Sequence, residues 1–354
     1  MNKKLDVISV IVPIYNGAKW IDFCFHSILK QNADDTQFQL EVCVCNDCST
    51  DETSTLLEKW KDHFQEAGVS LKLFNNISEN PGGVGFAKNK AVSISTGRFL
   101  CFQDIDDVML PGRVQKQYQV AVNSSDNTIV GAQFKREPED STVRYTKWAN
   151  SLSQEQLSVQ VFTSHGPTVI MPTWFLYRAH FDKVGGFVEK GKGTPEDLIF
   201  FYKHLDLGGK IVRVDECLLI YRFHSDQATF SVHQDTIWNL RVDRLQKEIL
   251  SDWPQFTIWN AGKQGKKLYN SLSKENQAKV VAFCDVDGNK IGKPYIPYNP
   301  NDRKGKKKMI EIVHFKDAHP PLVICVKMDM TGGVFEDNLQ SLNLQEGLEY
   351  VIFS

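Results

Sequence analysis

The chain has 354 residues, of which 42% are hydrophobic and 24% are charged, and its formal net charge is −2. This composition is typical of a globular protein and excludes collagen-like, low-complexity and disordered chains, while the length allows two or three domains. No apolar run reaches the roughly 20 residues that cross a membrane, and the first apolar run, 7–12, is too short for a secretory signal. We therefore expect no membrane partner.

Eight cysteines are scattered along the chain, and several of them, such as Cys101 and Cys325, lie inside apolar runs. Such positions are typical of reduced thiols in a cytosolic or nuclear protein, and we expect a cytoplasmic location. Cys43, Cys45 and Cys48 have no second Cys or His pair nearby, so their spacing does not favour a zinc site.

Strands and helices alternate through the first half of the chain. Apolar runs predict strands at 7–13, 39–45, 69–74 and 98–102. The spacing of apolar residues predicts helices between them at 19–31, 51–67 and 84–95. This alternation predicts a mainly parallel sheet covered by helices, in which ligands bind outside the carboxyl ends of the strands.

Polar residues follow three of these strands. Asn16, Asp47 and Asp104 each come just after a predicted strand, so we expect them to converge on one site. Asp106 and Asp107 follow Asp104, and carboxylates gathered at the end of a buried strand repel one another unless a cation lies among them. Hard oxygen ligands favour Mg²⁺ or Mn²⁺, which bridge to substrate phosphates. The alternative is that one carboxylate caps the next helix while the others are solvated.

The second half of the chain is less regular at first. The stretch 124–224 mixes short strands with glycine-rich turns, and 226–250 has the apolar spacing of a helix. A strand–turn–helix pattern then restarts, in which Gly262 and Gly265 keep two glycines of a dinucleotide-binding turn and Asn260 replaces the other. This turn is compatible with two interpretations: a domain that binds a dinucleotide, and a domain that has the turn but binds no dinucleotide. We predict three parts: a first domain at 1–225, a helical connector at 226–253 and a second domain at 254–354.

Six short motifs resemble, in order and spacing, those of family 2 glycosyltransferases with the GT-A fold: 10–16, 46–51, 85–89, 104–107, 195–197 and 221–224. The resemblance implies an α/β protein whose catalytic domain has a GT-A, Rossmann-like and mostly parallel sheet. The restarted pattern adds a smaller C-terminal Rossmann-like α/β domain. The resemblance also implies an inverting transfer of a sugar from a UDP-sugar, with a divalent metal, Mn²⁺ or Mg²⁺, as cofactor.

A narrower resemblance extends over nearly the whole chain and lies mainly in four further segments: 166–175, 256–265, 280–287 and 331–354. They are similar to glycosyltransferases that modify queuosine in tRNA. This implies UDP-galactose as the donor and queuosine at the wobble position of tRNA-Tyr as the acceptor. Two alternatives stay open: an enzyme that transfers N-acetylglucosamine from its UDP form to a glycan or protein, and an inactive nucleotide-sugar-binding scaffold. Self-association into a homo-oligomer also stays open.

The family resemblance implies a set of donor-binding residues: Pro13, Tyr15, Asn16, Asp47, Lys88, Asp104, Trp174 and Arg222. In chemical terms, the turn at 13–16 can form one wall of a base pocket, and the Asp47 carboxylate can accept the uracil N–H. Lys88 can reach uracil or phosphate, and the Arg222 guanidinium can clamp the diphosphate. Trp174 is either part of a surface for the sugar or queuine, or a core residue.

The resemblance also implies three metal ligands: Asp104, Asp106 and His224. An inverting transfer needs one base to take the proton of the acceptor hydroxyl, and our candidate is Asp197, oriented by Glu196. Both carboxylates fall in the first turn of a helix that we expect to begin at Pro195, with Thr194 as N-cap. The alternative is that they only complement the helix dipole.

Basic residues are concentrated late in the chain. Between 253 and 309 there are twelve Lys or Arg residues and four Asp or Glu residues. The run 303–308, with Lys263, Lys266 and Lys267, is our candidate for contact with RNA phosphates, although such runs are usually solvated loops. Because the sequence pI is about 6.5, an RNA footprint would have to be a patch rather than the whole surface.

Overall fold

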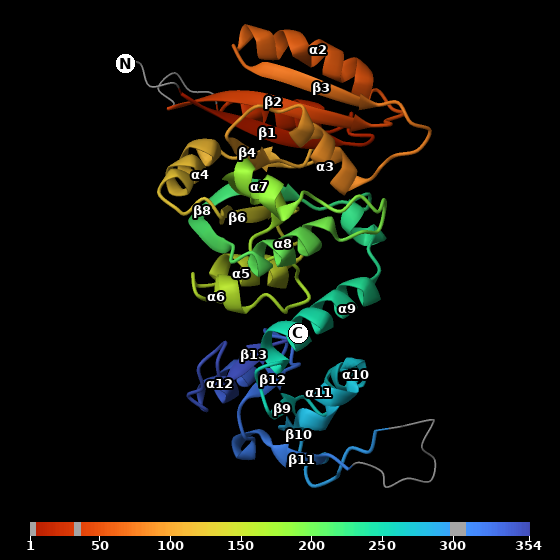
Figure 1. Cartoon of the computed structure of the whole chain (residues 1–354), viewed down its shortest axis with the longest axis vertical. Coiled ribbons are helices and arrows are strands. Elements are labelled where there is room, and N and C mark those ends of the chain that lie inside the picture. Colours follow the sequence, from red (N-terminus) through yellow and green to blue (C-terminus); the bar gives the residue numbers. More distant parts are fainter. Residues whose placement is uncertain (1–4, 32–36, 298–308) are drawn as a thin grey trace. The chain divides into compact units, whose positions relative to one another are not determined.

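The computed structural model describes residues 5–31, 37–297 and 309–354, and its elements can be followed in Figure 1. The chain forms two compact units: unit 1 comprises 1–158 and 167–233, and unit 2 comprises 159–166 and 234–354. The predicted connector at 226–253 is therefore divided between the units. The short segment 159–166 belongs to unit 2 although unit 1 surrounds it in the sequence.

Unit 1 contains, within the described residues, an eight-stranded sheet in the order β3-β2-β1-β4-β7-β6-β8-β5. Its strands are β1 (Asp6–Ile14), β2 (Phe38–Asp47), β3 (Ser70–Asn76), β4 (Phe99–Phe102), β5 (Val108–Met109), β6 (Thr128–Glu137), β7 (Phe175–Tyr177) and β8 (Lys210–Arg222). Strands β3, β2, β1 and β4 are parallel to one another, and so are β6 and β8. Strands β7 and β5 run antiparallel to their neighbours.

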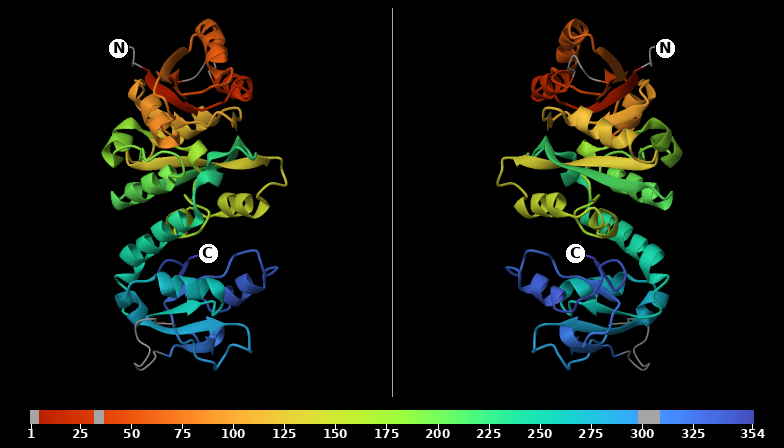
Figure 2. Two further views of the ribbon diagram at one scale, coloured as in Figure 1. Left: turned by 90° about the vertical axis from the view of Figure 1, so that its right-hand side faces the viewer. Right: turned by 90° about the vertical axis from the view of Figure 1, so that its left-hand side faces the viewer.

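The helices of unit 1 can be followed in Figure 2. They are α1 (Ile21–Leu29), α2 (Thr53–Glu66), α3 (Val84–Ser93), α4 (Arg113–Val122), α5 (Val143–Ser151), α6 (Gln156–Val159), α7 (Arg178–Val184) and α8 (Glu196–Asp206), with short 3₁₀ turns η1 (Met171–Thr173) and η2 (Ala228–Ser231). The α/β prediction is confirmed, and each predicted strand and helix of the first half is present with its ends shifted by at most two residues.

The apolar pattern of the sequence explains why these elements pack. Helix α1 buries Ile21, Cys24 and Phe25, which recur at helical spacing. They join Val10 and Val44, from the neighbouring strands β1 and β2, in one hydrophobic core. The buried strands hold their carboxyl ends at a common edge of the sheet, which is where the candidate site lies.

Unit 2 contains, among the residues described, a parallel five-stranded sheet in the order β11-β10-β9-β12-β13. Its strands are β9 (Phe256–Trp259), β10 (Val280–Asp285), β11 (Glu311–His314), β12 (Leu322–Ile324) and β13 (Tyr350–Ile352). Its helices are α9 (Gln234–Leu245), α10 (Lys263–Ser271), α11 (Lys274–Lys279) and α12 (Val334–Gln340), with the π-helical turn η3 (Gln246–Leu250) and the 3₁₀ turn η4 (Phe315–Asp317).

The strand order of unit 2 confirms the predicted second α/β sheet. The chain runs from β9 outward to β10 and β11 and then returns to β12 on the other side of β9. This doubly wound order places a topological switch point between β9 and β12. Within the described part of the chain, no helix combines the length and the apolar character needed to cross a membrane.

Candidate active site

The loops that follow β1 and β2 are tied together by Asn16. The Asn16 side-chain Oδ1 accepts the Thr50 backbone N–H at 2.7 Å, and the Asn16 backbone N–H donates to Ser49 Oγ at 2.9 Å. Asn16 has a positive φ of 50°, which asparagine tolerates better than most residues. Next to it, Pro13 is half-buried in β1, and the Tyr15 side chain is 55% exposed. The predicted turn at 13–16 therefore lies at the carboxyl edge of the sheet with an exposed aromatic ring.

The Asp47 carboxylate at the end of β2 closes the loop that leads into α3. One oxygen accepts the Asn76 side-chain amide at 2.7 Å and the Gly82 N–H at 3.0 Å, and the other accepts the Gly83 N–H at 2.8 Å. Asp47 is only 2% exposed. These hydrogen bonds show that Asp47 holds the loop in place. Its contact with uracil stays a prediction.

Three carboxylates gather after β4. Oxygens of Asp104, Asp106 and Asp107 all lie within 4.8 Å of one another. Burial raises the pKa of Asp104 to about 6, with the nearby Lys88 ammonium opposing the rise. Burial and the charges of Asp106 and Asp104 raise the pKa of Asp107 well above its usual range. A divalent cation would remove this repulsion, so the donor set fits Mg²⁺ or Mn²⁺.

One interpretation of the sequence was that a carboxylate of this cluster caps the next helix, but Asp107 does not. Helix α4 begins after Gly112 without a side-chain cap. Asp107 Oδ1 instead accepts the Arg222 backbone N–H at 2.9 Å, and Asp107 Oδ2 has no hydrogen-bond partner among the described residues. Asp107 therefore fixes the end of β8 beside the carboxylate cluster.

The end of β8 brings two of the predicted residues to this cluster. His224 Nε2 lies 2.9 Å from Asp106 Oδ2, so the two predicted metal ligands are in direct contact. The Arg222 guanidinium donates to the Asp106 backbone carbonyl at 3.3 Å and to Glu137 Oε2 at 3.2 Å. The structure thus brings together a carboxylate, an imidazole and a guanidinium from segments more than a hundred residues apart.

Two aromatic side chains of the first helix region support this group. The Trp20 ring lies 5.1 Å from the His224 ring, measured between centroids. The Arg222 guanidinium lies 5.2 Å from the centre of the Trp20 ring and 4.8 Å from that of Phe23. Such contacts fix the direction of a guanidinium through cation–π attraction. The sequence pattern did not single out Trp20, Phe23 or Glu137, because these contacts are purely tertiary.

Lys88 joins α3 to the start of α8. The Lys88 side chain is almost fully buried, and its Nζ donates to Glu196 Oε1 at 2.8 Å. Burial acts to lower the pKa of Lys88, but the carboxylates of Glu196 and Asp104 outweigh it, so this pKa is raised. Lys88 is therefore a buried cation that links the carboxylates after β4 to those of α8.

Asp197 lies beside this pair. Burial raises the pKa of Asp197 to about 6, and the charge of Glu196 adds to the rise while Lys88 opposes it. A carboxyl group with such a pKa can take a proton near neutral pH more readily than an ordinary aspartate. The helix itself begins at Glu196, with Pro195 as N-cap and no side-chain cap, so the predicted start at Pro195 with Thr194 as N-cap is wrong.

Trp174 lies in the core and not on a binding surface. It is fully buried, and its indole N–H donates to the Val169 carbonyl at 2.9 Å. Its ring packs against the rings of Phe187, Phe200 and Phe201. The structure therefore favours the core reading of Trp174 over the predicted donor-binding role, because no face of the ring is left for a ligand.

Arg136 is a further cation at this edge of the sheet that the sequence pattern did not indicate. It lies near the end of β6, is 7% exposed, and its guanidinium centre lies 3.7 Å from the centre of the Tyr221 ring. Arg136 Nε has no hydrogen-bond partner in the described residues. The charged stretch 135–137 at the end of an apolar run was the only sequence signal for it.

The basic residues divide into two groups. The run 303–308 lies outside the described residues. Lys263 and Lys267 are exposed on α10, where Lys267 pairs with Asp235 at 3.2 Å, and Lys266 is half-buried with its Nζ over the Tyr295 ring.

Comparison with known proteins places the chain in a family. Residues 9–185, which are half of the chain, match the model of the family described as Glycosyl transferase family 2, so the chain belongs to this family. The matched range contains most of β1, all of β2 to β7, and the carboxylates that follow β4.

Individual relatives are similar to parts of the chain. Glycosyltransferase GlyG of Streptococcus pneumoniae serotype 4 is 25% identical over 229 residues, which are 62% of this chain and 72% of GlyG. The poly(ribitol-phosphate) beta-N-acetylglucosaminyltransferase TarS of Staphylococcus aureus is 39% identical over 99 residues, which are 28% of this chain and 16% of TarS. A crystal structure of TarS residues 1–349 with UDP-GlcNAc has a TM-score of 0.52 at 21% identity, and the match covers 76% of this chain and 71% of that one. The last similarity supports the GT-A fold.

Proposed function

We propose that this member of glycosyl transferase family 2 is an inverting, metal-dependent enzyme that moves galactose from UDP-galactose to queuosine at the wobble position of tRNA-Tyr. One observation carries the catalytic part: carboxylates, an imidazole and a guanidinium meet at the carboxyl edge of the sheet in unit 1, within reach of the buried pair Lys88 and Glu196. This arrangement has the charges needed to bind a cation and a diphosphate together.

The donor side rests on Asp104, Asp106 and His224, which would hold Mn²⁺ or Mg²⁺. When bound, the cation would neutralise the diphosphate of the leaving UDP. Arg222 would contribute a second positive charge, and its position between Trp20, Phe23 and Glu137 supports that role. Holding the guanidinium in place before the donor arrives lowers the entropy lost on binding.

The acceptor side rests on Asp197. As the acceptor oxygen attacks the anomeric carbon, the bond from that carbon to UDP breaks, and Asp197 would take the proton of the attacking hydroxyl. Its raised pKa supports this role, because a base with a pKa of about 6 is ionised at neutral pH and still basic enough to take the proton. Lys88 would keep Glu196 and the base oriented and ionised.

The acceptor itself is supported by the sequence outside the matched family range. The segments 256–265, 280–287 and 331–354, which are similar to enzymes that modify queuosine in tRNA, all belong to unit 2. A tRNA acceptor also agrees with the basic stretch 253–309. It implies a compartment that contains tRNA, for which we propose the cytoplasm.

An N-acetylglucosaminyl donor is the second candidate, because TarS is named as an N-acetylglucosaminyltransferase and shares 39% identity over 99 residues with this chain. The two donors can be compared directly by measuring UDP release from UDP-galactose and from UDP-N-acetylglucosamine, with Mn²⁺ and total tRNA present. Faster release from UDP-galactose that depends on added tRNA supports the proposal. Preference for UDP-N-acetylglucosamine, or release that tRNA does not change, contradicts it.

A further inference from the structure

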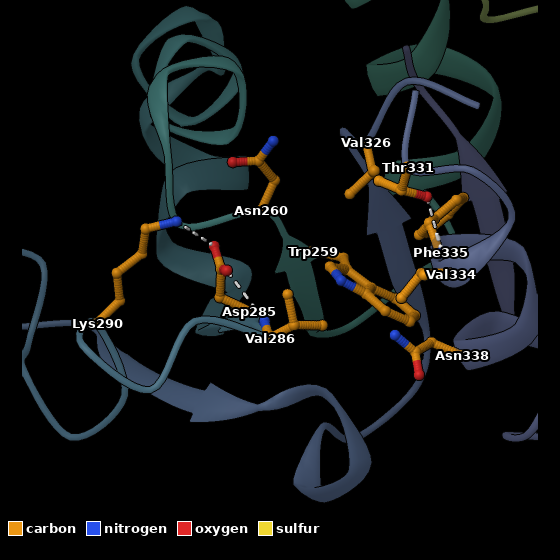
Figure 3. A pocket seen from close by; sticks show the side chains of 10 residues that line it. All are labelled: Trp259, Asn260, Asp285, Val286, Lys290, Val326, Thr331, Val334, Phe335 and Asn338. Atoms are coloured by element: carbon orange, nitrogen blue, oxygen red, sulfur yellow. Dashed lines mark hydrogen bonds and ion pairs between the residues drawn. The ribbon is translucent and has the colours of Figure 1, made fainter. Parts of the chain in front are cut away.

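Unit 2 has a cavity of about 190 Å³ at the carboxyl ends of β9, β10 and β12, and Figure 3 shows the side chains around it. Trp259 lines this cavity but is 2% exposed, because its ring stacks on Phe315 and meets the edge of Phe335. The Asp285 carboxylate is already paired with Lys290 at 3.0 Å. The lining therefore identifies no ligand for this cavity. A buried polar cluster in unit 1 carries more information.

Arg113, the first residue of α4, is a buried cation that the proposed mechanism does not use. It is fully buried. Its guanidinium donates to the Phe102 carbonyl at 2.7 Å and to the Pro172 carbonyl at 2.6 Å. It also donates to two side-chain amide oxygens, Gln103 Oε1 at 2.6 Å and Gln117 Oε1 at 3.0 Å. All four acceptors are neutral. Because a charge without a carboxylate partner is costly to bury, stability alone is a poor reason for an arginine at this position.

Gln103 links this arginine to the carboxylates after β4. Gln103 directly follows β4, is fully buried, and its Nε2 donates to the Asp104 carbonyl at 2.9 Å. A guanidinium has only donors, so it can face the amide oxygen of Gln103 but not the amide nitrogen. The nitrogen is thereby left for the Asp104 carbonyl. Arg113 therefore determines which end of the Gln103 amide meets the backbone of Asp104.

The Asp104 carbonyl is the point at which the acidic turn closes. It also accepts the Asp107 backbone N–H at 3.2 Å, which is the hydrogen bond of a turn from Asp104 to Asp107. This turn brings oxygens of Asp104, Asp106 and Asp107 within 4.8 Å of one another. Carboxylates at this separation repel one another, so the backbone has to hold them together before a cation arrives.

The shape of the arginine side chain suits this task. Its contacts reach three segments of unit 1: the end of β4 through Phe102 and Gln103, α4 through Gln117, and η1 through Pro172. A planar fork with five donors can bond all of these acceptors at once, and a lysine ammonium has three donors and no fixed plane. The backbone is thus held by Arg113 just before Gln103 and by the Gln103 amide just after it.

We propose that Arg113 and Gln103 are positioning residues for the metal, which hold the backbone at 102–104 so that the carboxylates of Asp104 and Asp106 are in place before Mn²⁺ or Mg²⁺ binds. The inference rests on the metal site of the proposed function. Residues that orient metal ligands without touching the metal contribute about 10- to 100-fold in metal affinity.

The test measures the Kd for Mn²⁺ by electron paramagnetic resonance on the full chain, with and without UDP, and records urea unfolding of each variant. Gln103→Met removes the amide and keeps the length of the side chain. Gln117→Met is the matched control, because it also removes a neutral partner of Arg113 but one that has no bond to Asp104. Gln117 donates to the carbonyls of Val130 and Thr173 as well, so the control should lose at least as much stability as Gln103→Met.

Gln103→Met should raise the Kd for Mn²⁺ about 10- to 100-fold, while Gln117→Met unfolds at lower urea concentration than the wild type and keeps the wild-type Kd. Arg113→Lys keeps the charge without the fork and should also raise the Kd. Gln103→Met carries the test if Arg113→Lys does not fold.

Two results would overturn the inference and leave the metal site standing. The first is a wild-type Kd in Gln103→Met, which would mean that the pair only stabilises the packing of β4 against α4. The second is an equal rise of the Kd in Gln103→Met and Gln117→Met, which would trace the loss to general loosening. If the wild type binds no Mn²⁺ with or without UDP, the metal site of the proposed function is wrong, and the inference falls with it.

Discussion

The pKa of Asp197 predicts how activity depends on pH. A carboxyl group with a pKa of about 6 is about 90% ionised at pH 7 and about 10% ionised at pH 5. If Asp197 is the base, kcat/KM should therefore fall about tenfold between these two values as the pH is lowered. An ordinary aspartate with a pKa of about 3.9 would lose less than a tenth of its ionised form over the same range.

The fall of kcat/KM at low pH should be steeper when the metal is limiting, because a second carboxylate then also takes up a proton. Asp104 also has a pKa of about 6, and metal ligands must be deprotonated to bind. With saturating Mn²⁺ the acid limb should reflect one proton, and with limiting Mn²⁺ its slope should approach two. The steepness of the acid limb therefore separates the base from the ligand.

A substitution of Lys88 tests whether the pKa of Asp197 sets the acid limb. Its ammonium favours the ionised form of Asp197, so Lys88→Gln should move the acid limb of kcat/KM to higher pH. The matched control is Lys90→Gln, two positions along α3, where the lysine lies over the rings of Phe74 and Phe86. Lys88→Gln should also lower the free energy of unfolding by about 3–5 kcal/mol, because it leaves the mostly buried Glu196 carboxylate without its cation.

The assay is sugar transfer measured from about pH 5 to pH 8, with urea unfolding of each variant recorded at the same pH values. A kcat/KM that does not fall between pH 7 and pH 5 in the wild type would refute the assignment of Asp197. A downward movement of the limb in Lys88→Gln, or an equal movement in Lys90→Gln, would refute the electrostatic argument even if Asp197 is the base.

Four further changes have defined outcomes. Asp197→Asn should lower kcat about 10²- to 10⁴-fold and leave UDP binding, measured by calorimetry, unchanged. Asp106→Asn should weaken Mn²⁺ binding about tenfold or more, measured by electron paramagnetic resonance without substrates. Trp174→Ala should lower the free energy of unfolding by about 3–5 kcal/mol in urea, while the folded protein keeps its KM for the donor. Neutralising the lysines of 306–308 should weaken tRNA binding and reduce its salt dependence by about one unit of slope for each phosphate that a lysine no longer neutralises.

Each of these outcomes has a contrary result. Full transfer activity in Asp197→Asn would remove it as the base. Asp126→Asn, at an exposed position, is the control for Asp106→Asn, and equal Mn²⁺ affinities in the two would remove the ligand role. A raised donor KM in Trp174→Ala at unchanged stability would restore the binding role that its burial argues against. An unchanged salt slope would exclude 306–308 from the RNA footprint.

The carboxyl edge of the parallel strands could be predicted, because the local sequence pattern determines where each strand ends. Alternating apolar runs and helical spacing located the elements of the first half, and the positions of Asn16, Asp47 and Asp104 after strands followed from them. The carboxylates after β4 were visible as a short motif. Contacts such as that of Asp106 with His224 followed only from the family resemblance, because no local pattern links residues so far apart in the chain.

Other features could not be predicted from the sequence because they depend on tertiary packing. An aromatic residue in a motif reads the same whether it binds a ligand or fills a core, and Trp174 fills the core. The support of Arg222 by Trp20 and Glu137, and the position of Arg136 over Tyr221, arise between distant segments. The assignment of 159–166 to unit 2 has no pattern of its own in the sequence.

The most direct test of the proposed function is the transfer of radiolabelled galactose from UDP-galactose, with Mn²⁺, to total tRNA with and without queuosine. The proposal predicts label in tRNA that contains queuosine, none in tRNA that lacks it, and none when Mn²⁺ is chelated. Equal labelling of both tRNA preparations, or no labelling by a protein that binds UDP, would contradict it.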